Sequence, residues 1–296
     1  MTPTPWRAYA ALALSTSLVG SYVGLSKLLL LVFPVFLLAW LRFTLAASMM
    51  ASWLKRGPAE AALDGRTRWL LFFESFIGNF LFSICLLFGL RHSSALVAGV
   101  ILAGIPAAVA LLSRAFLRER ISRRVGLGLV LGVAGIALVA LQKNQGATAS
   151  ENTALGIALL IAAVFCEATY VVIGKQLTAQ ISARRISALI NLWGLALVTP
   201  LGLWQALSFD FSQPSPSQWG LLVFYAAAAS MVSVWLWMTG LRHVPAAKAG
   251  VFMVFLPVAT GLVGLGLGEQ LQPSQAAAYA LALAGVILAT WPEVKS

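Results

Sequence analysis

The chain has 296 residues, of which 60% are hydrophobic and only 10% charged, and its mean hydropathy is +0.90. This composition lies far outside the balance of soluble domains and predicts one integral membrane domain, 1–296. The formal net charge of +11 does not indicate nucleic-acid binding, because membrane proteins concentrate Lys and Arg in their cytoplasmic loops. Both cysteines, Cys85 and Cys166, fall in apolar runs, so we expect no disulfide framework and no cysteine metal site.

Apolar runs repeatedly reach the roughly 20 residues that a helix needs to cross a bilayer. The first run is full length and lacks a small-residue cleavage site, so it predicts a retained span and not a signal peptide. The fold class is therefore an all-α integral membrane protein. In chain order the ten predicted transmembrane helices are about 8–31, 34–54, 69–90, 94–117, 124–141, 154–177, 185–207, 217–241, 245–267 and 273–291.

Two stretches of the sequence are copies of one another. Leu90–Pro106 reads LRHSSALVAGVILAGIP, and Leu241–Pro257 reads LRHVPAAKAGVFMVFLP. Each copy places a proline about halfway along an apolar run, where the missing N–H loosens a helix. Lipid cannot satisfy the freed backbone groups, so matched interruptions of this kind point to a transporter's binding site. The candidate hinge or gating residues are Gly99, Gly104, Pro106, Gly250 and Pro257.

The duplication divides the chain into two halves, 1–147 and 148–296. Five spans per half is an odd number, so the second half has to enter the membrane from the opposite side. The prediction is two inverted five-helix repeats around a central cavity. Most Lys and Arg fall on the side of the N-terminus, whereas the other side collects only Arg91 and Lys143. Both termini are therefore expected to be cytoplasmic.

Further matches extend the duplication along each half. Ser21-Tyr22-Val23 with Lys27 matches Thr169-Tyr170-Val171 with Lys175, and Glu119 matches Glu269. Halves of five spans, with a Lys at the end of the first, a Pro in the fourth and a Glu before the fifth, resemble the EamA-type members of the drug/metabolite transporter superfamily. The resemblance covers nearly the whole chain. It implies an exporter in the bacterial inner (cytoplasmic) membrane, similar to exporters of amino acids, aromatic ones included.

Glu167 is the sharpest single signal for a functional residue. It lies near the middle of its predicted span, where an ionised carboxylate is costly, and the first half has Val19 at the matching place. It could bind and release a proton, or make a structural hydrogen bond, and the sequence leaves both open. The stretch from Glu167 to Lys175 is similar to the first helix of the small multidrug resistance transporters. That resemblance implies a glutamate that binds both proton and cation.

Other polar and aromatic side chains also fall near mid-depth. Aromatic faces hold apolar substrates and attract cations, while Arg42 and Asn79 offer hydrogen bonds to a substrate. Structural pairing, helix contacts and the interfacial aromatic belt are the alternatives. Glu74 and Lys27 lie near span ends, so we expect their charged groups to extend to the interface. The candidate substrate-binding residues are Tyr22, Trp40, Arg42, Asn79, Glu167, Tyr170, Trp193 and Trp237.

Motifs for ATP hydrolysis or enzyme chemistry are absent from the sequence, which has no phosphate loop, HExxH motif or paired intramembrane aspartates. We therefore predict no enzyme activity, no cofactor and no metal. The predicted function is export of small metabolites by alternating access, with amino acids, neutral and aromatic ones included, as first choice. The alternatives are a multidrug or other metabolite efflux carrier, then a channel or structural membrane subunit. The expected partners are a small-molecule substrate and the lipid bilayer, and the chain is expected to be a monomer, with a homodimer as the alternative.

Overall fold

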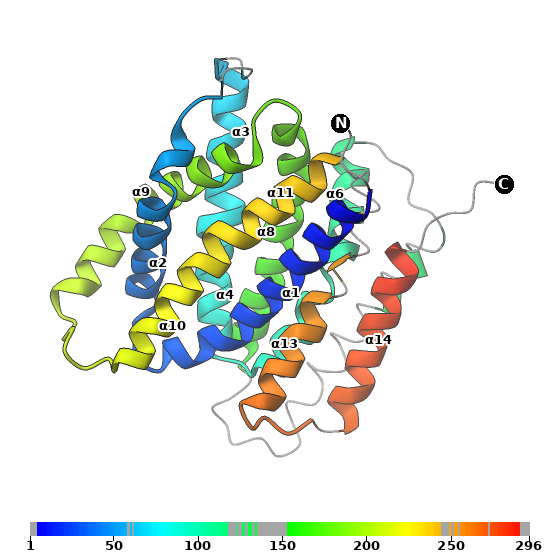
Figure 1. The fold of residues 1–296 in the computed structure, drawn as a ribbon. Helices are drawn as coiled ribbons and strands as arrows, with labels where there is room; N and C mark the ends of the chain where they lie inside the picture. The colour runs from blue at the N-terminus through cyan, green and yellow to red at the C-terminus, as the bar shows by residue number, and fades with distance from the viewer. Residues whose placement is uncertain are drawn as a thin grey trace.

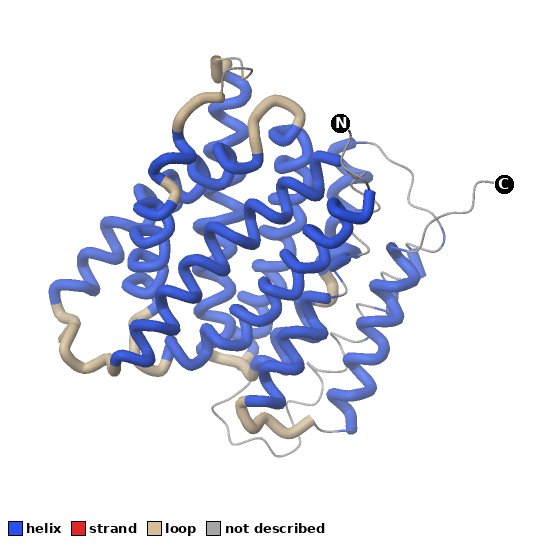
Figure 2. The backbone as a smooth tube through the Cα atoms, in the orientation of Figure 1, coloured by secondary structure: helices blue, strands red, loops and turns tan. Residues whose placement is uncertain are grey.

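The structure is a computed structural model that describes residues 5–57, 60, 62–117, 123, 126–127, 130–131, 134, 153–243, 249, 252–253, 255–271 and 273–290. Throughout these ranges the regular elements are helices, joined by turns and loops (Figure 2), which confirms the predicted all-α class. Six helical stretches are long and apolar enough to cross a membrane: Trp6–Leu30, Gly65–Arg91, Val97–Phe116, Ala154–Thr178, Ala183–Leu207 and Pro216–His243. The expected span at 124–141 lies almost entirely outside the described residues.

The described helices form one bundle (Figure 1). In chain order they are α1 (Pro5–Leu30), α2 (Val35–Met49), α3 (Gly65–Ser75), α4 (Phe82–Arg91), α5 (Ala95–Leu102), α6 (Ile105–Leu117), α8 (Ala154–Thr178), α9 (Ala183–Leu207), α10 (Pro216–Ala226), α11 (Ser233–His243), α13 (Phe255–Gly266) and α14 (Pro273–Thr290). A short 3₁₀ turn, η1 (Ala51–Leu54), follows α2. Two π-helical segments, η2 (Phe76–Leu81) and η4 (Ala227–Val232), join α3 to α4 and α10 to α11 without a break.

Local sequence explains where several of these helices begin. The Asp64 carboxylate accepts a hydrogen bond from Thr67 N at 2.8 Å and caps α3, and the Thr153 hydroxyl caps α8 in the same way. Ser215 and Gln218 form a reciprocal capping box at α10, with Pro216 in the first turn. Such caps satisfy N–H groups that have no partner inside the helix.

Two predicted spans differ from single straight helices. The segment predicted at 94–117 is broken at Ala103 and Gly104. Helix α5 ends at Leu102, and α6 begins at Ile105 with Pro106 in its first turn. Proline is well tolerated in a first turn, where its missing N–H needs no partner. The segment predicted at 34–54 is shorter than expected, because α2 ends at Met49 and η1 follows it.

Equivalent positions in the two halves make equivalent contacts. Gly89 of α4 lies against Leu160 of α8, and Gly240 of α11, 151 positions after Gly89, lies against Leu12 of α1. The first helix of each half therefore packs on the third-span helix of the other half. A Cβ at either glycine would lie 2.8 Å or less from the leucine Cγ, so the glycine is what permits this close approach.

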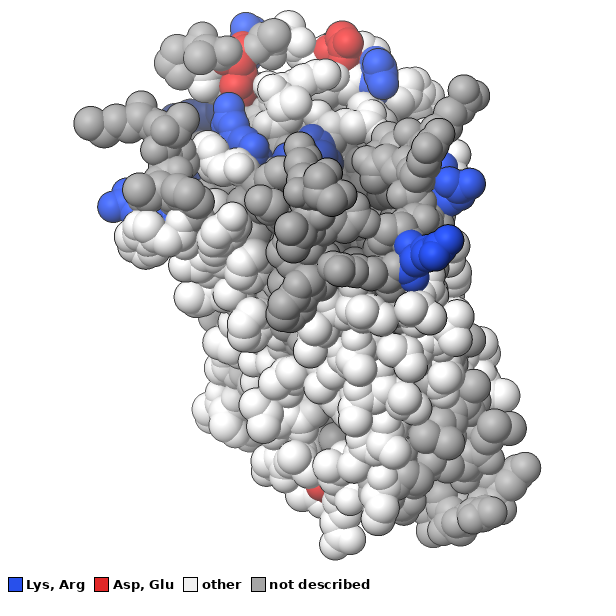
Figure 3. Space-filling model, turned by 90° about the vertical axis from the view of Figure 1, so that its right-hand side faces the viewer, with Lys and Arg blue, Asp and Glu red and all other residues white. Residues whose placement is uncertain are grey.

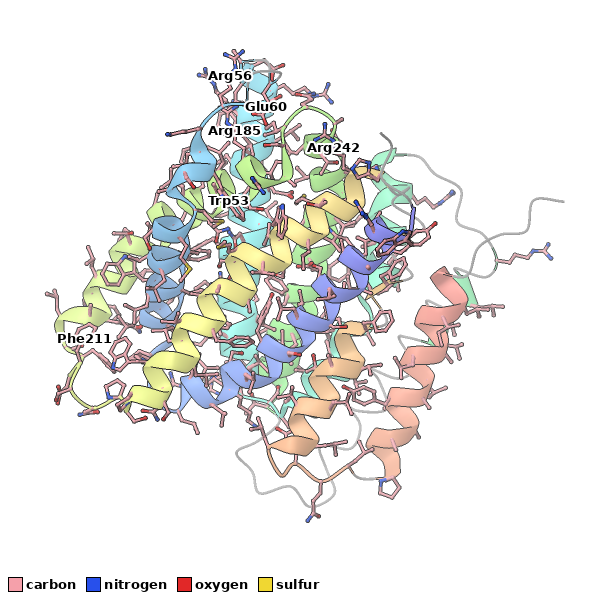
Figure 4. The ribbon with its side chains drawn as sticks, viewed as in Figure 1. Trp53, Arg56, Glu60, Arg185, Phe211 and Arg242 are labelled. Carbon is pink, nitrogen blue, oxygen red and sulfur yellow. The ribbon has the colours of Figure 1, made fainter. Side chains whose placement is uncertain are left out.

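Charge is concentrated at one end of the bundle. On the face shown in Figure 3, the described Lys and Arg side chains gather at the upper end, and the lower part is almost uncharged. Arg56, Glu60, Arg185 and Arg242 lie at this upper end, whereas Phe211 lies toward the opposite end (Figure 4). We call it the basic end. The beginning of α1 and the end of α14 are both on this side of the molecule (Figure 1).

Candidate functional site

A cavity lies inside the bundle, between its long helices. Its wall takes side chains from both halves, and we call it the central cavity. Polar or charged groups on the wall are Ser15, Thr16, Tyr22, Arg42, Asn79, Glu167, Tyr170, Ser233 and Trp237. The remaining wall residues are Val19, Gly78, Phe82, Ile190, Ala229, Val234, Met253 and Leu256.

Arg42 brings a positive charge to this wall from the middle of α2. The side chain is 3% exposed, and its Nη2 donates to Ser83 Oγ at 2.6 Å and, at the long distance of 3.5 Å, to Asn79 Oδ1. Its guanidinium lies 4.1 Å from the centre of the Phe43 ring. Nε has no hydrogen-bond partner, and none of the described carboxylates lies within 4.0 Å. The protein thus holds a buried cation whose charge it leaves unpaired.

Glu167 supplies the opposite charge from the middle of α8. Its side chain is on the cavity wall, and the described residues give it neither a hydrogen bond nor an ion pair. Val19, its counterpart in the first half, is on the same wall. The two halves therefore present a carboxyl and an apolar side chain at matching places, so the charge of the cavity is asymmetric although its architecture is repeated.

Aromatic side chains form much of the remaining surface. Tyr22 and Tyr170, which match one another in the two halves, both line the cavity, together with Phe82 and Trp237. Tyr22 meets Tyr225 edge to face, with 5.7 Å between ring centres. The Tyr170 hydroxyl and Trp237 Nε1 are buried without a partner among the described residues. Buried donors of this kind are costly to leave unsatisfied, so they are available to a ligand.

The two π segments lie at the same place in each half and both reach the cavity. Gly78 of η2 and Ala229 of η4 are 151 positions apart and are both on the wall. In the second half, neighbouring helices satisfy the rearranged backbone: Asn191 Nδ2 donates to Ser230 O at 2.9 Å, and Ser15 Oγ donates to Ser233 O at 2.7 Å. Isolated π turns inside α-helices are frequently found at functional sites. The sequence carried no signal for them.

Six of the eight predicted binding residues meet at the cavity: Tyr22, Arg42, Asn79, Glu167, Tyr170 and Trp237. Trp40 and Trp193 do not lie on its wall. Trp40 donates from Nε1 to Thr199 Oγ1 at 3.2 Å between α2 and α9, and Trp193 is 44% exposed and packs on Phe72. Both sit at a suitable depth, but their side chains leave the helix on a face turned away from the cavity.

The predicted hinge residues lie on two segments, of which only one contributes to the cavity wall. Gly99, Gly104 and Pro106 are buried around the α5–α6 break, which contributes no side chain to the cavity wall. Gly250 is outside the described residues, and Pro257 is in the first turn of α13. This second segment does reach the cavity, through Met253 and Leu256. It is fixed to α1 by Thr16 Oγ1, which donates to Phe252 O at 2.8 Å.

One expectation about charged residues near span ends is corrected, that for Glu74, and the one for Lys27 stays a prediction. Glu74 does not extend to the interface, because its side chain is completely buried between α3 and α8. Lys27 forms an ion pair with Glu269, with 3.0 Å between Nζ and Oε1, and the same oxygen accepts from Ala95 N. Sequence reasoning also missed Ser15 and Thr16. The spacing of Ser15, Val19 and Tyr22 along one helix face is the signal that could have indicated them.

The fold and the site together define a class: a multi-pass helical membrane protein, built in two similar halves, with a charged internal cavity between its long helices. The model of the EamA-like transporter family matches the chain twice, over residues 6–141 and 154–291. The chain therefore belongs to this family and is a membrane transporter.

Two similar relatives come from Bacillus subtilis (strain 168). "Uncharacterized transporter YetK" is 34% identical over 254 residues, which span 85% of this chain and 76% of the relative. "Uncharacterized transporter YyaM" is 23% identical over 214 residues, spanning 72% and 70%. A solved structure described as "Crystal structure of protein" has a similar fold, with a TM-score of 0.65 and 18% identity over 95% of this chain and 96% of that one.

Proposed function

We propose that this transporter exports a small zwitterionic metabolite, an amino acid in the first instance. The observation that carries the proposal is a pair of unpaired opposite charges on one cavity wall. Arg42 has no carboxylate and Glu167 has no cationic group within 4.0 Å among the described residues. A ligand that carries both a carboxylate and an amine would satisfy both side chains at once, and either charge alone would leave one of them uncompensated.

The rest of the wall suits the side chain of such a ligand. Tyr22, Tyr170, Phe82 and Trp237 offer aromatic surface, and among the wall residues only Arg42 and Glu167 carry a full charge. Aromatic rings favour offset or edge-to-face contact with another ring and accept aliphatic groups equally well. We therefore infer that neutral and aromatic amino acids are the preferred substrates.

Alternating access is the mechanism we propose, with residues 1–147 and 148–296 acting as inverted five-helix repeats. Support comes from the reciprocal Gly89–Leu160 and Gly240–Leu12 contacts and from the matched π segments beside the cavity. The positive-inside rule assigns the basic end to the cytoplasm. Because α1 begins and α14 ends at that end, both termini are cytoplasmic in this proposal, as in a bacterial inner-membrane protein (Figure 1).

A second candidate is efflux of an organic cation. It is favoured by Glu167 together with Tyr22, Tyr170 and Trp237, because aromatic faces and a carboxylate attract a cation. The buried guanidinium of Arg42 opposes it, since a cation in the cavity would share the space with an uncompensated like charge.

Counterflow in liposomes tests the proposal and separates the candidates. The reconstituted parent is expected to exchange a labelled neutral amino acid saturably, which a static channel does not do. In Glu167→Gln we expect exchange of the amino acid to fall, whereas a ligand with the carboxylate but no amine is still bound. Glu60→Gln, at the basic end, is the control for removal of a carboxylate. Exchange of organic cations but not of amino acids by the parent would instead support the second candidate.

A further inference from the structure

A second carboxyl group lies close to the central cavity but is not on its wall. Glu74, in the last turn of α3, is completely buried. Neither carboxylate oxygen has a hydrogen-bond partner, and no described Lys, Arg or His lies within 4.0 Å. An ionised carboxylate without partners is strongly disfavoured in such a place, so in this arrangement Glu74 is the neutral acid.

One face of α8 connects this carboxyl group to the cavity. Glu167, Tyr170 and Gly174 follow one another at the three- and four-residue spacing that aligns side chains on a helix. Gly174 makes room for Glu74, because a Cβ at Gly174 would lie 2.9 Å from Glu74 Oε1. Tyr170 packs against η2, since a Cβ at Gly78 would lie 2.5 Å from Tyr170 Cβ. The face therefore runs from Glu167 on the cavity wall, past Tyr170, whose hydroxyl has no partner, to Gly174 beside Glu74.

No described cation on the surrounding helices neutralises this group. On α9, Arg185 is paired with Glu60 and Arg184 lies over the rings of Trp53 and Trp235. At the end of α11, Arg242 and His243 are exposed. On α8, Lys175 donates to Leu241 O at 2.7 Å. The titratable groups that lie nearest Glu74 along this face of α8 are therefore Tyr170 and Glu167.

The other half of the protein shows that the fold does not require this carboxyl. Tyr225 of α10 lies 151 positions after Glu74, and it packs edge to face on Tyr22, the counterpart of Tyr170. The second half thus fills the matching place with a neutral phenol. Both intramembrane carboxyls, Glu74 and Glu167, stand where the opposite half has an uncharged side chain, which is Tyr225 for one and Val19 for the other.

We propose that Glu74 is a proton-binding site, distinct from the substrate site, which exchanges its proton through the hydroxyl of Tyr170 and the wet cavity at Glu167. The step is a simple acid–base exchange: the carboxylic acid gives its proton to the Tyr170 oxygen while the Tyr170 hydroxyl gives its own proton to water, which leaves a carboxylate, an unchanged phenol and hydronium. The reverse transfers return the proton to Glu74. The site lies on the side of the cavity toward the basic end, because α3 starts there (Figure 1). The inference rests on the proposed function, because we couple entry of a proton into the cytoplasm to export of the substrate.

A pH gradient across liposomes tests the coupling. Liposomes that are acidic inside are expected to accumulate a labelled neutral amino acid in the parent, and substrate is expected to release protons that a trapped dye reports. In Glu74→Gln we expect substrate affinity within about twofold of the parent, with gradient-driven accumulation and substrate-induced proton flux lost. Glu60→Gln, which removes a carboxylate at the basic end, is expected to keep both. Parental accumulation and proton flux in a folded Glu74→Gln protein would overturn the proposal.

Infrared titration provides a readout that needs no substrate. The parent and Glu167→Gln are expected to show the carbonyl stretch of a protonated carboxyl group at neutral pH, and Glu74→Gln and Glu74→Met are expected to lack it. Glu74→Met is the second variant because it leaves no buried amide to satisfy, so its thermal midpoint should equal or exceed that of the parent. Absence of the signal from the parent would overturn the proton site. Absence of amino-acid binding to the parent, with the signal present, would overturn only the proposed substrate class.

Discussion

Arg42→Gln is the most informative change at the central cavity. The glutamine keeps a donor that reaches toward Ser83 but removes the positive charge that we assign to the substrate carboxylate. A hydrogen bond to a charged partner contributes about 1.5–3 kcal/mol, which corresponds to about a 10- to 150-fold loss of affinity. We expect a loss of this size for a neutral amino acid.

The structure predicts little change in stability from the same substitution. Its main cost is the hydrogen bond from Nη2 to Ser83 Oγ, at 2.6 Å. This cost is offset because the variant also removes Nε, a buried donor without a partner, whose burial costs about 1–3 kcal/mol. The two terms are of similar size and opposite sign, so the thermal midpoint should stay near that of the parent.

Titration calorimetry in nanodiscs, with thermal stability measured on the same preparation, would check both halves of this prediction. The matched ligand is the amine that remains when the carboxylate is removed from the amino acid. Its affinity should be equal or higher in Arg42→Gln, because the like charge near the amine has gone. Equal loss of amino acid and amine, or no loss of the amino acid, would show that Arg42 does not bind the carboxylate.

Three further changes have expected outcomes. Gly240→Ala places a Cβ 2.6 Å from Leu12 Cγ and should lower the free energy of unfolding by about 1–3 kcal/mol, as measured by thermal or denaturant unfolding. The control is Gly220→Ala, whose Cβ would have no atom within 4 Å, and it should be neutral or stabilising. Equal effects of the two substitutions would contradict the packing argument. Burial raises the pKa of Glu60, but hydrogen bonds from Ser182 and Arg185 outweigh it and leave the pKa below its usual 4.5. The ionised Glu60 therefore stabilises the fold by about 1 kcal/mol above pH 4.5, and this stabilisation is lost as the pH falls through the lowered pKa. Melting curves of Glu60→Gln should lack this loss of stability in acid. Pro106→Ala supplies an N–H that can donate to Leu102 O and so join α5 to α6. Transport should slow, while the thermal midpoint stays the same or rises. A folded variant that transports at the parental rate would show that Pro106 serves only packing.

The depth of each polar residue could be read from the sequence, but the direction of its side chain could not. Glu167 and the pair Tyr22 and Tyr170 were predicted near mid-depth from the sequence, and in the structure all three line the cavity. Trp193 has a similar depth, yet it is 44% exposed on the outside of the bundle. Glu74 was expected at the interface and is instead completely buried. In a soluble helix the polar stripe identifies the outer face, but a span in lipid is apolar on both sides.

The sequence by itself determined the helical class, the duplication and the asymmetry of basic residues, because the length of an apolar run, the identity of repeated residues and the positions of charges are all properties of a linear string. Only the tertiary structure decided that Arg42 and Glu167 share one cavity and that Glu74 is buried against Gly174 of α8. It also revealed the matched π segments at Phe76–Leu81 and Ala227–Val232. These features depend on the rotation of each helix about its axis, which packing against the other half sets and which local sequence does not encode.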